Sequence, residues 1–396
     1  MDSHARAEPL LATASEPSGD GVDVVVVGVG TMGSMALWRL ARRGASVLGL
    51  ERFEPGHDRG SGHGESRMIR SAYFEGPGYV PLVRSSFRLW RELEAEAGEE
   101  LLRPTGALMI GRPDHPLVAG AMRSARAHGL AHEVLTPAEA RARFPEHRLE
   151  PDEVALWEAE AGVLRPERAI VAAATRARAL GAALIPGVRV TAVEADGGGA
   201  TVRAGERAWR ARHAVVSAGA WLGGLLPTLE LPLAVERQVM AWFEARQPER
   251  FAPGRFPVFI HERGGVYGYG LPTLDGRTVK VGVHHQGRPV DPDRPDREVT
   301  EADVAPAVRV AAEMLEGLQA RPARAQVCLY TNTPDGHFVV GPAPGLPGVT
   351  LLSACSGHGF KFAPVMGEIA ADLALAGGTD HPVTEFSPGR LARLGG

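Results

Sequence analysis

The N-terminal part of the chain joins an apolar segment, a glycine-rich turn and an amphipathic segment in direct succession. Residues 22–27 read VDVVVV, an apolar β-branched run typical of a strand that is buried on both faces. The turn at residues 28–33 (GVGTMG) follows, and the apolar residues of 34–43 (SMALWRLARR) then recur at helical spacing. Residues 45–50 (ASVLGL) predict a second strand, and Glu51 closes it. This order predicts the opening unit of an α/β dinucleotide-binding domain.

Each glycine of the turn has a physical task in such a unit. Gly28 permits the tight turn, Gly30 lets the backbone approach a pyrophosphate, and Gly33 lets the helix pack closely on the strand. The free N–H groups at the helix N-terminus attract phosphate. Glu51 can accept hydrogen bonds from an adenosine ribose, which disfavours a 2′-phosphate and so favours FAD or NAD over NADP.

The segment after Glu51 favours a flavin without excluding a nicotinamide. Residues 53–71 (FEPGHDRGSGHGESRMIRS) are glycine-rich, polar and irregular, with His63, Arg67 and Arg70 close together. An NAD domain would continue with another helix and strand, whereas a flavoprotein uses a long polar loop here to wrap its cofactor. An NAD-dependent dehydrogenase remains the alternative from a different class.

Composition sets broad limits on the protein. A chain of 396 residues is long enough for two domains, and its net charge of −4 gives no reason to expect nucleic-acid binding. No run of about 18 apolar residues predicts a membrane span, and we predict no metal site. Two cysteines suit a reducing compartment, so a cytoplasmic location is expected. Residues 1–20 lack the apolar core of a secretory signal and are expected to be a disordered tail.

Four segments carry a resemblance to a known family. They are residues 60–90 (GSGHGESRMIRSAYFEGPGYVPLVRSSFRLW), 279–285 (VKVGVHH), 328–338 (CLYTNTPDGHF) and 356–368 (SGHGFKFAPVMGE). In this order and spacing the chain resembles the monomeric sarcosine oxidase and N-methyltryptophan oxidase family. The resemblance implies an α/β fold with a Rossmann-like FAD-binding domain of the glutathione-reductase/hydroxybenzoate-hydroxylase type and a second domain built on a large mixed sheet.

The cofactor motifs are spread along the chain, so the FAD-binding domain is expected to be discontinuous. We assign residues 21–102, 162–232 and 332–396 to it, and residues 103–161 and 233–331 to the substrate domain. Within the second domain, residues 301–319 predict a helix, and the Pro-rich residues 287–297 (GRPVDPDRPDR) predict a linker.

The resemblance implies a covalent flavin. It places Cys328 in a thioether to the flavin 8α-methyl group. A thiolate that attacks there needs positive charge nearby, which Arg67 and Arg70 can supply. An inert buried cysteine is the alternative from the residues alone. The other cysteine, Cys355, follows an apolar run and is interpreted as core packing.

Further cofactor contacts follow from the same resemblance. Val190, in a strand within residues 183–193, is expected against the adenine, and Gly219 lies in the small-residue turn after another buried strand. The backbone amides of Gly357 and Gly359 are expected to face the flavin pyrimidine edge, where N–H donors stabilise the negative charge of reduction.

The resemblance also assigns the basic residues. It places His63 and Arg67 beside the flavin ring and Arg70 on the substrate carboxylate, where a guanidinium fork can donate two parallel hydrogen bonds. It implies that Lys361 is the second ligand of the substrate carboxylate and that Tyr330 lies near this carboxylate.

Three residues are expected at the reacting end. Lys280 matches the lysine held by a water near flavin N5, where oxygen is activated. His284 shares one face of its predicted strand with Lys280, and Tyr269 is expected to line the substrate cavity beside it.

These assignments together predict an FAD-dependent oxidase of a secondary, N-methylated amino acid. A hydride equivalent leaves the carbon next to nitrogen, the imine hydrolyses to release formaldehyde, and O2 becomes H2O2. An oxidase of a cyclic imino acid would share every motif, and a non-catalytic flavin-binding protein would share the cofactor residues. The expected partners are a small amino acid and O2, and the resemblance favours a monomer with one flavin.

Overall fold

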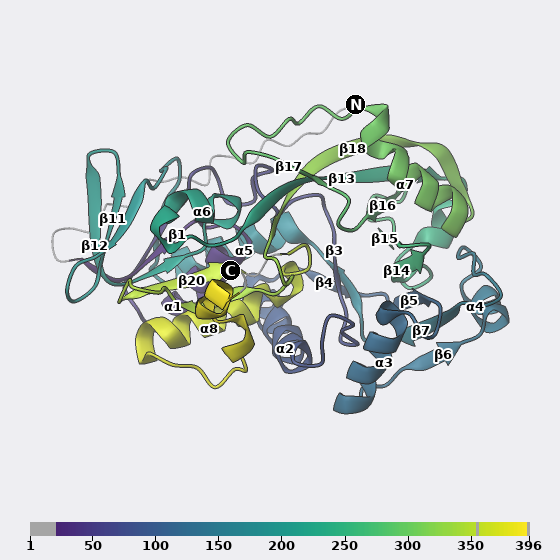
Figure 1. Ribbon diagram of the computed structural model, residues 1–396, viewed down its shortest axis with the longest axis horizontal. Helices are drawn as coiled ribbons and strands as arrows, with labels where there is room; N and C mark the ends of the chain where they lie inside the picture. Colours follow the sequence, from purple (N-terminus) through teal and green to yellow (C-terminus); the bar gives the residue numbers. More distant parts are fainter. Residues whose placement is uncertain (1–20, 354–355, 394–396) are drawn as a thin grey trace.

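The computed structural model describes residues 21–353 and 356–393. It contains two large sheets that lie at opposite ends of an elongated molecule (Figure 1). The disordered tail expected at residues 1–20 and the core packing expected of Cys355 concern residues that lie outside the described ones. Within those residues, no helix has both the length and the apolar character that a membrane crossing requires.

The first sheet is built around the N-terminal strand. Parallel strands β12 and β2 flank β1, and the order across the sheet is β10-β11-β12-β1-β2-β9, with β20 beside β12 and β19 beside β20. The strands of this sheet are β1 (Val22–Val27), β2 (Val47–Leu50), β9 (Ala183–Ile185), β10 (Ala192–Ala195), β11 (Ala200–Ala204), β12 (Arg207–Val216), β19 (Val339–Pro342) and β20 (Val349–Ser353).

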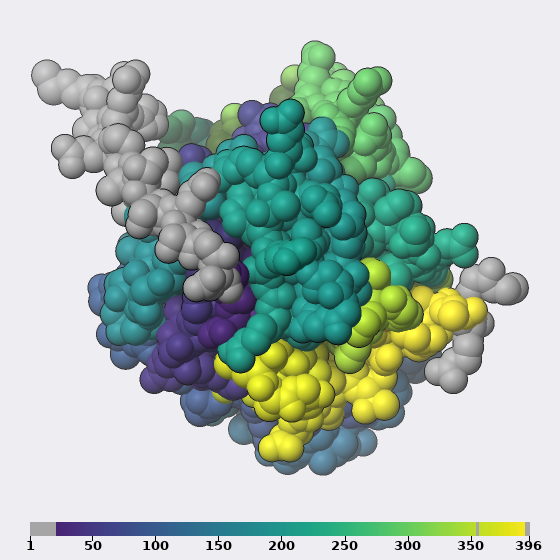
Figure 2. All heavy atoms as spheres, turned by 90° about the vertical axis from the view of Figure 1, so that its left-hand side faces the viewer, coloured from purple at the N-terminus to yellow at the C-terminus, as the bar shows by residue number. Residues whose placement is uncertain are grey.

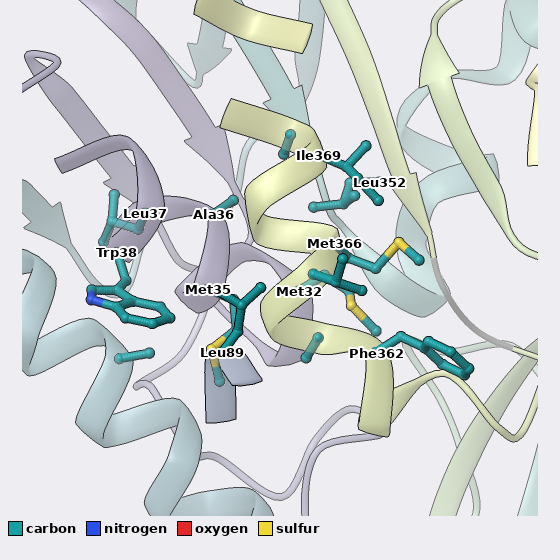
Figure 3. Packing of buried hydrophobic residues seen from close by; sticks show 14 of the residues in the cluster. Met32, Met35, Ala36, Leu37, Trp38, Leu89, Leu352, Phe362, Met366 and Ile369 are labelled. Atoms are coloured by element: carbon teal, nitrogen blue, oxygen red, sulfur yellow. The ribbon is translucent and has the colours of Figure 1, made fainter. Parts of the chain in front are cut away.

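Helices cover one face of this sheet and form the largest core. Helix α1 (Thr31–Arg42) packs between α5 (Pro166–Ala179) and α8 (Ala363–Ala376), and α2 (Tyr79–Ala97) packs outside them. A Cβ at Gly367 would lie 2.5 Å from the backbone carbon of Met35, so only glycine permits this approach of α8 to α1. Figure 3 shows the side chains that fill the contact between the two helices, which include Met32, Met35, Met366 and Ile369.

The second sheet is mixed and has the order β17-β13-β16-β15-β14-β5-β7-β6, with β18 paired to β13. Helix α7 (Glu301–Met314) packs on it, and α3 (Pro116–His128) and α4 (Pro137–Arg143) lie near β5 and β7. Its strands are β5 (Ala107–Gly111), β6 (Glu133–Leu135), β7 (Val154–Glu158), β13 (Ala234–Ala245), β14 (Val258–Arg263), β15 (Val266–Leu271), β16 (Thr278–Val283), β17 (Arg288–Pro289) and β18 (Leu318–Asn332).

Short elements connect the two sheets. A three-stranded sheet has the order β3-β8-β4, and β18 runs from the second sheet toward the first, where the Thr331 carbonyl accepts a hydrogen bond of 2.9 Å from the Ser356 amide. The remaining strands are β3 (Arg67–Ile69), β4 (Leu102–Pro104) and β8 (Gly162–Leu164). The remaining helices are α6 (Leu222–Leu225) and the 3₁₀ turns η1 (Gly219–Trp221), η2 (Pro227–Leu229), η3 (Pro248–Phe251), η4 (Phe360–Phe362), η5 (Thr384–Phe386) and η6 (Pro388–Arg393).

The end of the molecule that carries the first sheet is assembled from distant parts of the sequence. In Figure 2, which views that end, a teal middle segment lies between the purple start of the described chain and the yellow C-terminal elements. The strands of the first sheet come from three separate parts of the sequence, residues 22–50, 183–216 and 339–353. The domain boundaries themselves stay a prediction.

Local predictions were correct in kind and wrong at some boundaries. The first strand occupies residues 22–27 as expected. The helix begins at Thr31, inside the glycine motif, and not at residue 34. The strand expected at the end of residues 183–193 does not contain Val190: β9 stops at Ile185, β10 begins at Ala192, and Val190 lies in the loop between them. The predicted helix 301–319 ends at Met314, because residues from Leu318 pair with β13 as the start of β18.

Candidate active site

A cavity of about 880 Å³ runs between the two sheets. At one end it is lined by the glycine turn after β1, and at the other by side chains of β15, β16 and β18. The predicted site residues that line it are Gly28, Gly30, Glu51, Arg67, Arg70, Val190, Gly219, Tyr269, Lys280, His284, Cys328, Tyr330, Gly357, Gly359 and Lys361. Residues up to 333 positions apart in the sequence therefore share one site.

The nucleotide end has the geometry that the glycine motif predicts. Gly28 has φ +85°, and a Cβ there would lie 2.8 Å from the Ser217 carbonyl oxygen. A Cβ at Gly33 would lie 1.8 Å from the Gly28 oxygen, so this glycine sets the helix–strand contact and does not line the cavity. A Cβ at Gly30 would meet no atom within 4 Å, which leaves its backbone open to the cavity.

The Glu51 carboxylate is already oriented by the backbone. It accepts hydrogen bonds from the amides of Val29 at 2.7 Å and Phe53 at 2.8 Å, and its side chain is buried. These two bonds fix the carboxylate at the rim of the cavity, where a ribose can reach its remaining lone pairs.

The flavin-side glycines and His63 differ in their placement. Gly357 has φ +78°, and a Cβ there would lie 2.4 Å from the Tyr330 ring, so a side chain would close the cavity at this point. His63 is buried but does not line the cavity, and its Nε2 has no hydrogen-bond partner among the described residues. Burial, followed by the charges of Arg67 and Lys280, lowers the pKa of His63 to about 3. His63 is therefore a neutral side chain behind the cavity wall.

Cys328 is buried on β18 beside a cation. The Arg67 Nη2 lies 3.7 Å from its sulfur, and the same nitrogen donates to the Ser61 carbonyl at 2.7 Å. A guanidinium at this distance supplies the nearby positive charge that a cysteine nucleophile needs. The only apolar neighbours grouped with Cys328 among the described residues are Met240 and Trp242.

Lys280 is a buried cation held by carbonyl groups. Its Nζ donates to the oxygens of Gly64 at 3.0 Å and Ser66 at 2.8 Å, and it lies 5.6 Å from the centre of the Trp242 ring. Burial, followed by the charge of Arg67, lowers its pKa. The Glu167 carboxylate accepts the Gly64 amide at 2.6 Å and so holds the loop that positions Lys280.

Arg70 is held by an acidic neighbour that the sequence reasoning did not identify. Its Nη2 donates to both oxygens of Glu75, at 2.8 and 2.7 Å, and its guanidinium lies over the rings of Tyr73 at 4.3 Å and Phe74 at 4.6 Å. The Nε of Arg70 is buried and has no partner in the described part of the chain. The expected carboxylate ligand thus already binds an internal carboxylate, and the Arg-x₄-Glu spacing was the available signal.

Lys361 completes a pair of buried cations at this end. It lies in η4, where its Nζ donates to the His358 carbonyl at 2.7 Å and to the Tyr73 hydroxyl at 3.3 Å. Burial, followed by the charge of Arg70, lowers the pKa of Lys361 to about 7. Such a residue can gain a full charge when a carboxylate binds beside it.

The remaining walls are aromatic and apolar. His284 Nδ1 and the Tyr330 hydroxyl lie 3.2 Å apart, and burial lowers the pKa of His284 well below its ordinary value, so its ring is neutral. Tyr269 lies against Gly282, where a Cβ would come within 2.5 Å of its hydroxyl oxygen. Sequence reasoning missed the apolar lining residues Met240, Phe74, Ile260 and Leu271, because apolar residues in strands and loops carry no signal of a cavity.

Comparison with known proteins places this arrangement in a family. A family model described as FAD dependent oxidoreductase matches residues 23–373. The chain belongs to the FAD-dependent oxidoreductase family of the monomeric sarcosine oxidases. It is 44% identical to a monomeric sarcosine oxidase of Streptomyces avermitilis, over 93% of this chain and 98% of the relative. It is 36% identical to an N-methyl-L-tryptophan oxidase of Salmonella arizonae, over 94% and 99% of the two chains.

Solved structures agree with this sarcosine oxidase-like assignment. NikD, an unusual amino acid oxidase essential for nikkomycin biosynthesis, superposes with a TM-score of 0.82 at 25% identity, covering 93% of this chain and 98% of that chain. The L-proline dehydrogenase of P. horikoshii has a TM-score of 0.81 at 23% identity, covering 94% and 98%, and shows the shared fold.

The residues present fit FAD. The open turn at Gly30 would accept the pyrophosphate, the oriented Glu51 carboxylate would accept the ribose, and the close approach at Gly357 would fit a flat flavin ring. The protein is therefore an FAD-dependent oxidoreductase, and the nicotinamide alternative is wrong.

Proposed function

We propose that the protein is an oxidase of a secondary, N-methylated amino acid. The observation that carries the proposal is that Arg70 and Lys361 are two buried basic side chains lining the same cavity, close enough for the charge of Arg70 to lower the pKa of Lys361. A carboxylate is the anion that best matches a guanidinium fork beside an ammonium group. The relatives named for sarcosine and N-methyl-L-tryptophan support an N-methyl amine next to that carboxylate.

The protein's own residues then orient and desolvate the substrate. Arg70 exchanges Glu75 for the substrate carboxylate, Lys361 binds the same group, and the neutral His284 and Tyr269 face the amine. When bound, FAD supplies the acceptor for a hydride equivalent from the carbon next to nitrogen and returns the electrons to O2. Lys280 offers a positive charge near the place where oxygen gains negative charge.

We also propose that the cofactor is covalently held through Cys328. Such a bond between the sulfur and the flavin 8α-carbon would form with loss of one proton from the thiol and one from the methyl group. O2 would accept these two protons and the two electrons as H2O2. The proximity of Arg67 supports the thiolate that this step needs. Acid precipitation tests it: flavin in the pellet of the parent protein and in the supernatant of Cys328→Ser is expected, and flavin in both supernatants would refute the bond.

The substrate proposal is tested by products. Sarcosine, N-methyl-L-tryptophan and other N-methyl amino acids are incubated with the protein, and formaldehyde, H2O2 and O2 uptake are measured. One formaldehyde and one H2O2 per O2 are expected, with loss of turnover in Arg70→Met. H2O2 without formaldehyde from a cyclic imino acid would favour the second candidate, which the apolar wall of the cavity can also accommodate. Turnover of no amine would favour a flavin-binding protein without catalysis.

We propose that one chain with one flavin is the functional unit, which the description of the relatives as monomeric sarcosine oxidases supports.

A further inference from the structure

The segment that the sequence predicts as a linker is tied firmly to the second sheet. Its first residues form β17, which pairs with β13. The buried Arg237 of β13 then donates to the carbonyl oxygens of Asp296 and Glu298, each at 2.6 Å, and to the Asp303 carboxylate at 2.7 Å. Residues 287–297 are therefore anchored at both ends by β13 and the start of α7.

The middle of the segment binds the other half of the molecule. The Asp293 carboxylate accepts hydrogen bonds from Arg52, from Arg189 at 2.7 Å and from the Trp221 indole at 2.8 Å. The guanidinium of Arg52 also lies over the Trp221 ring, 5.2 Å from its centre. These three partners come from two loops and the 3₁₀ turn η1, all of which follow strands of the first sheet, and one carboxylate joins them.

A second contact follows four residues later. Arg297 donates from Nη1 to the Asp58 carbonyl at 3.0 Å and from Nη2 to the Arg59 carbonyl at 2.9 Å. Asp58 and Arg59 lie in the polar loop after Glu51. Figure 1 shows the green segment reaching from the side of α7 toward that of α6.

The segment also forms part of the cavity wall. Asp291, Pro292 and Asp293 line the cavity together with Glu51 and Val190, which belong to its nucleotide end. The contacts of Asp293 thus lie at the part of the cavity next to Glu51, where a ribose can reach that carboxylate.

We propose that residues 287–297 form a clasp that closes the adenosine end of the FAD site, with the Asp293 carboxylate as its latch. An exposed ion pair contributes little by itself, and the Asp293 side chain is 31% exposed. Three donors on one carboxylate, with both ends of the segment anchored, make the closed position the preferred one. The clasp holds the cofactor independently of any bond at Cys328 and of the identity of the substrate.

The test measures FAD release directly. Cys328→Ser is loaded with FAD, so that no thioether holds it, and is compared with the same protein carrying Asp293→Asn or Asp296→Asn. Asp296 is the matched control, because its side chain pairs within the segment, with Arg288 at 3.0 Å. Release is followed by the rise of free-flavin fluorescence after dilution, and we expect it to be about tenfold faster in Asp293→Asn alone. Equal release from all three proteins would overturn the clasp.

Limited trypsin digestion gives a second readout on the same FAD-loaded proteins. Arg288 and Arg294 each precede a proline, so Arg297 is the arginine of the segment that trypsin can cleave readily. Cleavage after Arg297 is expected to be faster in Asp293→Asn than in the control. Unchanged cleavage together with unchanged release would show that Asp293 does not hold the segment. Release of FAD from the parent protein, which keeps Cys328, would refute the covalent bond. The comparison of Asp293→Asn with Asp296→Asn would still test the clasp.

Discussion

The Arg67 guanidinium lies 3.7 Å from the Cys328 sulfur, although 261 residues separate the two in the sequence. Strand β3 carries the arginine and β18 carries the cysteine, and the cavity brings the two side chains together. A permanent positive charge therefore lies beside the one thiol of the described residues. This contact is the physical basis of the proposed covalent flavin.

Removing this charge is expected to slow flavin attachment. A hydrogen bond to a charged group contributes about 1.5–3 kcal/mol, so Arg67→Met should attach flavin about ten- to a hundredfold more slowly. Acid-insoluble flavin is measured over time after FAD is added to protein produced without it. Arg67→Lys keeps the charge, so its rate of flavin attachment should lie between those of the parent protein and Arg67→Met. Attachment at the parent rate in Arg67→Met would show that the arginine does not activate the sulfur.

The pair Arg70–Glu75 predicts a competition for anions. Glu75→Gln removes the carboxylate that occupies Arg70, so acetate should bind about tenfold more tightly, as measured by the change in flavin absorbance. The same change leaves a buried charge unpaired and should lower the free energy of unfolding by about 3 kcal/mol. Glu244→Gln, which breaks an exposed pair with Arg277, is the control and should change neither quantity. Weaker acetate binding in Glu75→Gln would contradict the competition.

Lys361 predicts a pH dependence of carboxylate binding. Because its pKa is lowered to about 7, the ligand-free protein loses this ammonium charge as the pH rises through that value. A carboxylate prefers the protonated lysine, so the Kd for acetate should rise above pH 7 by up to about tenfold per pH unit. Lys361→Met should bind acetate more weakly at pH 6 and show no such rise. The same slope in both proteins would assign the titration to another group.

How much of this site could be predicted depended on the type of residue. Gly28, Gly33 and Glu51 follow a local pattern within one β-α-β unit, and their roles toward the cofactor stay a prediction. Lys280 and Cys328 were located through family motifs, and their contacts with Ser66 and Arg67 depend on tertiary packing that no local pattern encodes.

Other features could not be predicted for physical reasons. The strand expected at Val190 failed because the apolar residues there line a cavity instead of pairing with a neighbour. The helix predicted to residue 319 failed because Leu318 pairs with Ala245 of β13, a contact made across more than 70 residues. The Pro-rich segment 287–297 resembles a linker in composition, yet its carboxylates and arginines bind distant loops.

A buried histidine in the second sheet predicts how acid affects stability. His147 packs between Phe256 and Phe259, neither ring nitrogen has a partner in the described residues, and burial lowers its pKa to about 3. The side chain of His147 therefore takes up a proton near pH 6.5 in the unfolded chain but stays neutral at that pH in the folded chain. This group stabilises the fold fully above pH 6.5 and loses its contribution as the pH falls toward 3.

The matching variant is His147→Phe. Between pH 6.5 and 4.5 the parent should lose about 2 kcal/mol of unfolding free energy more than this variant, measured by urea unfolding at each pH. His132→Phe replaces a partly exposed histidine and should follow the parent. If His147→Phe loses stability with acid as steeply as the parent does, another buried group is responsible.

The central claim is that the cavity binds an N-methyl amino acid by its carboxylate and oxidises it next to nitrogen. The most direct measurement is anaerobic bleaching of the bound flavin after mixing with an N-methyl amino acid, with its carboxamide, and with the corresponding primary amino acid. We expect rapid bleaching by the N-methyl amino acid, a rate for the carboxamide lower by at least about a hundredfold, and loss of the fast phase in Arg70→Met. Equal bleaching by the carboxylate and the carboxamide, or unchanged bleaching in Arg70→Met, would contradict the account.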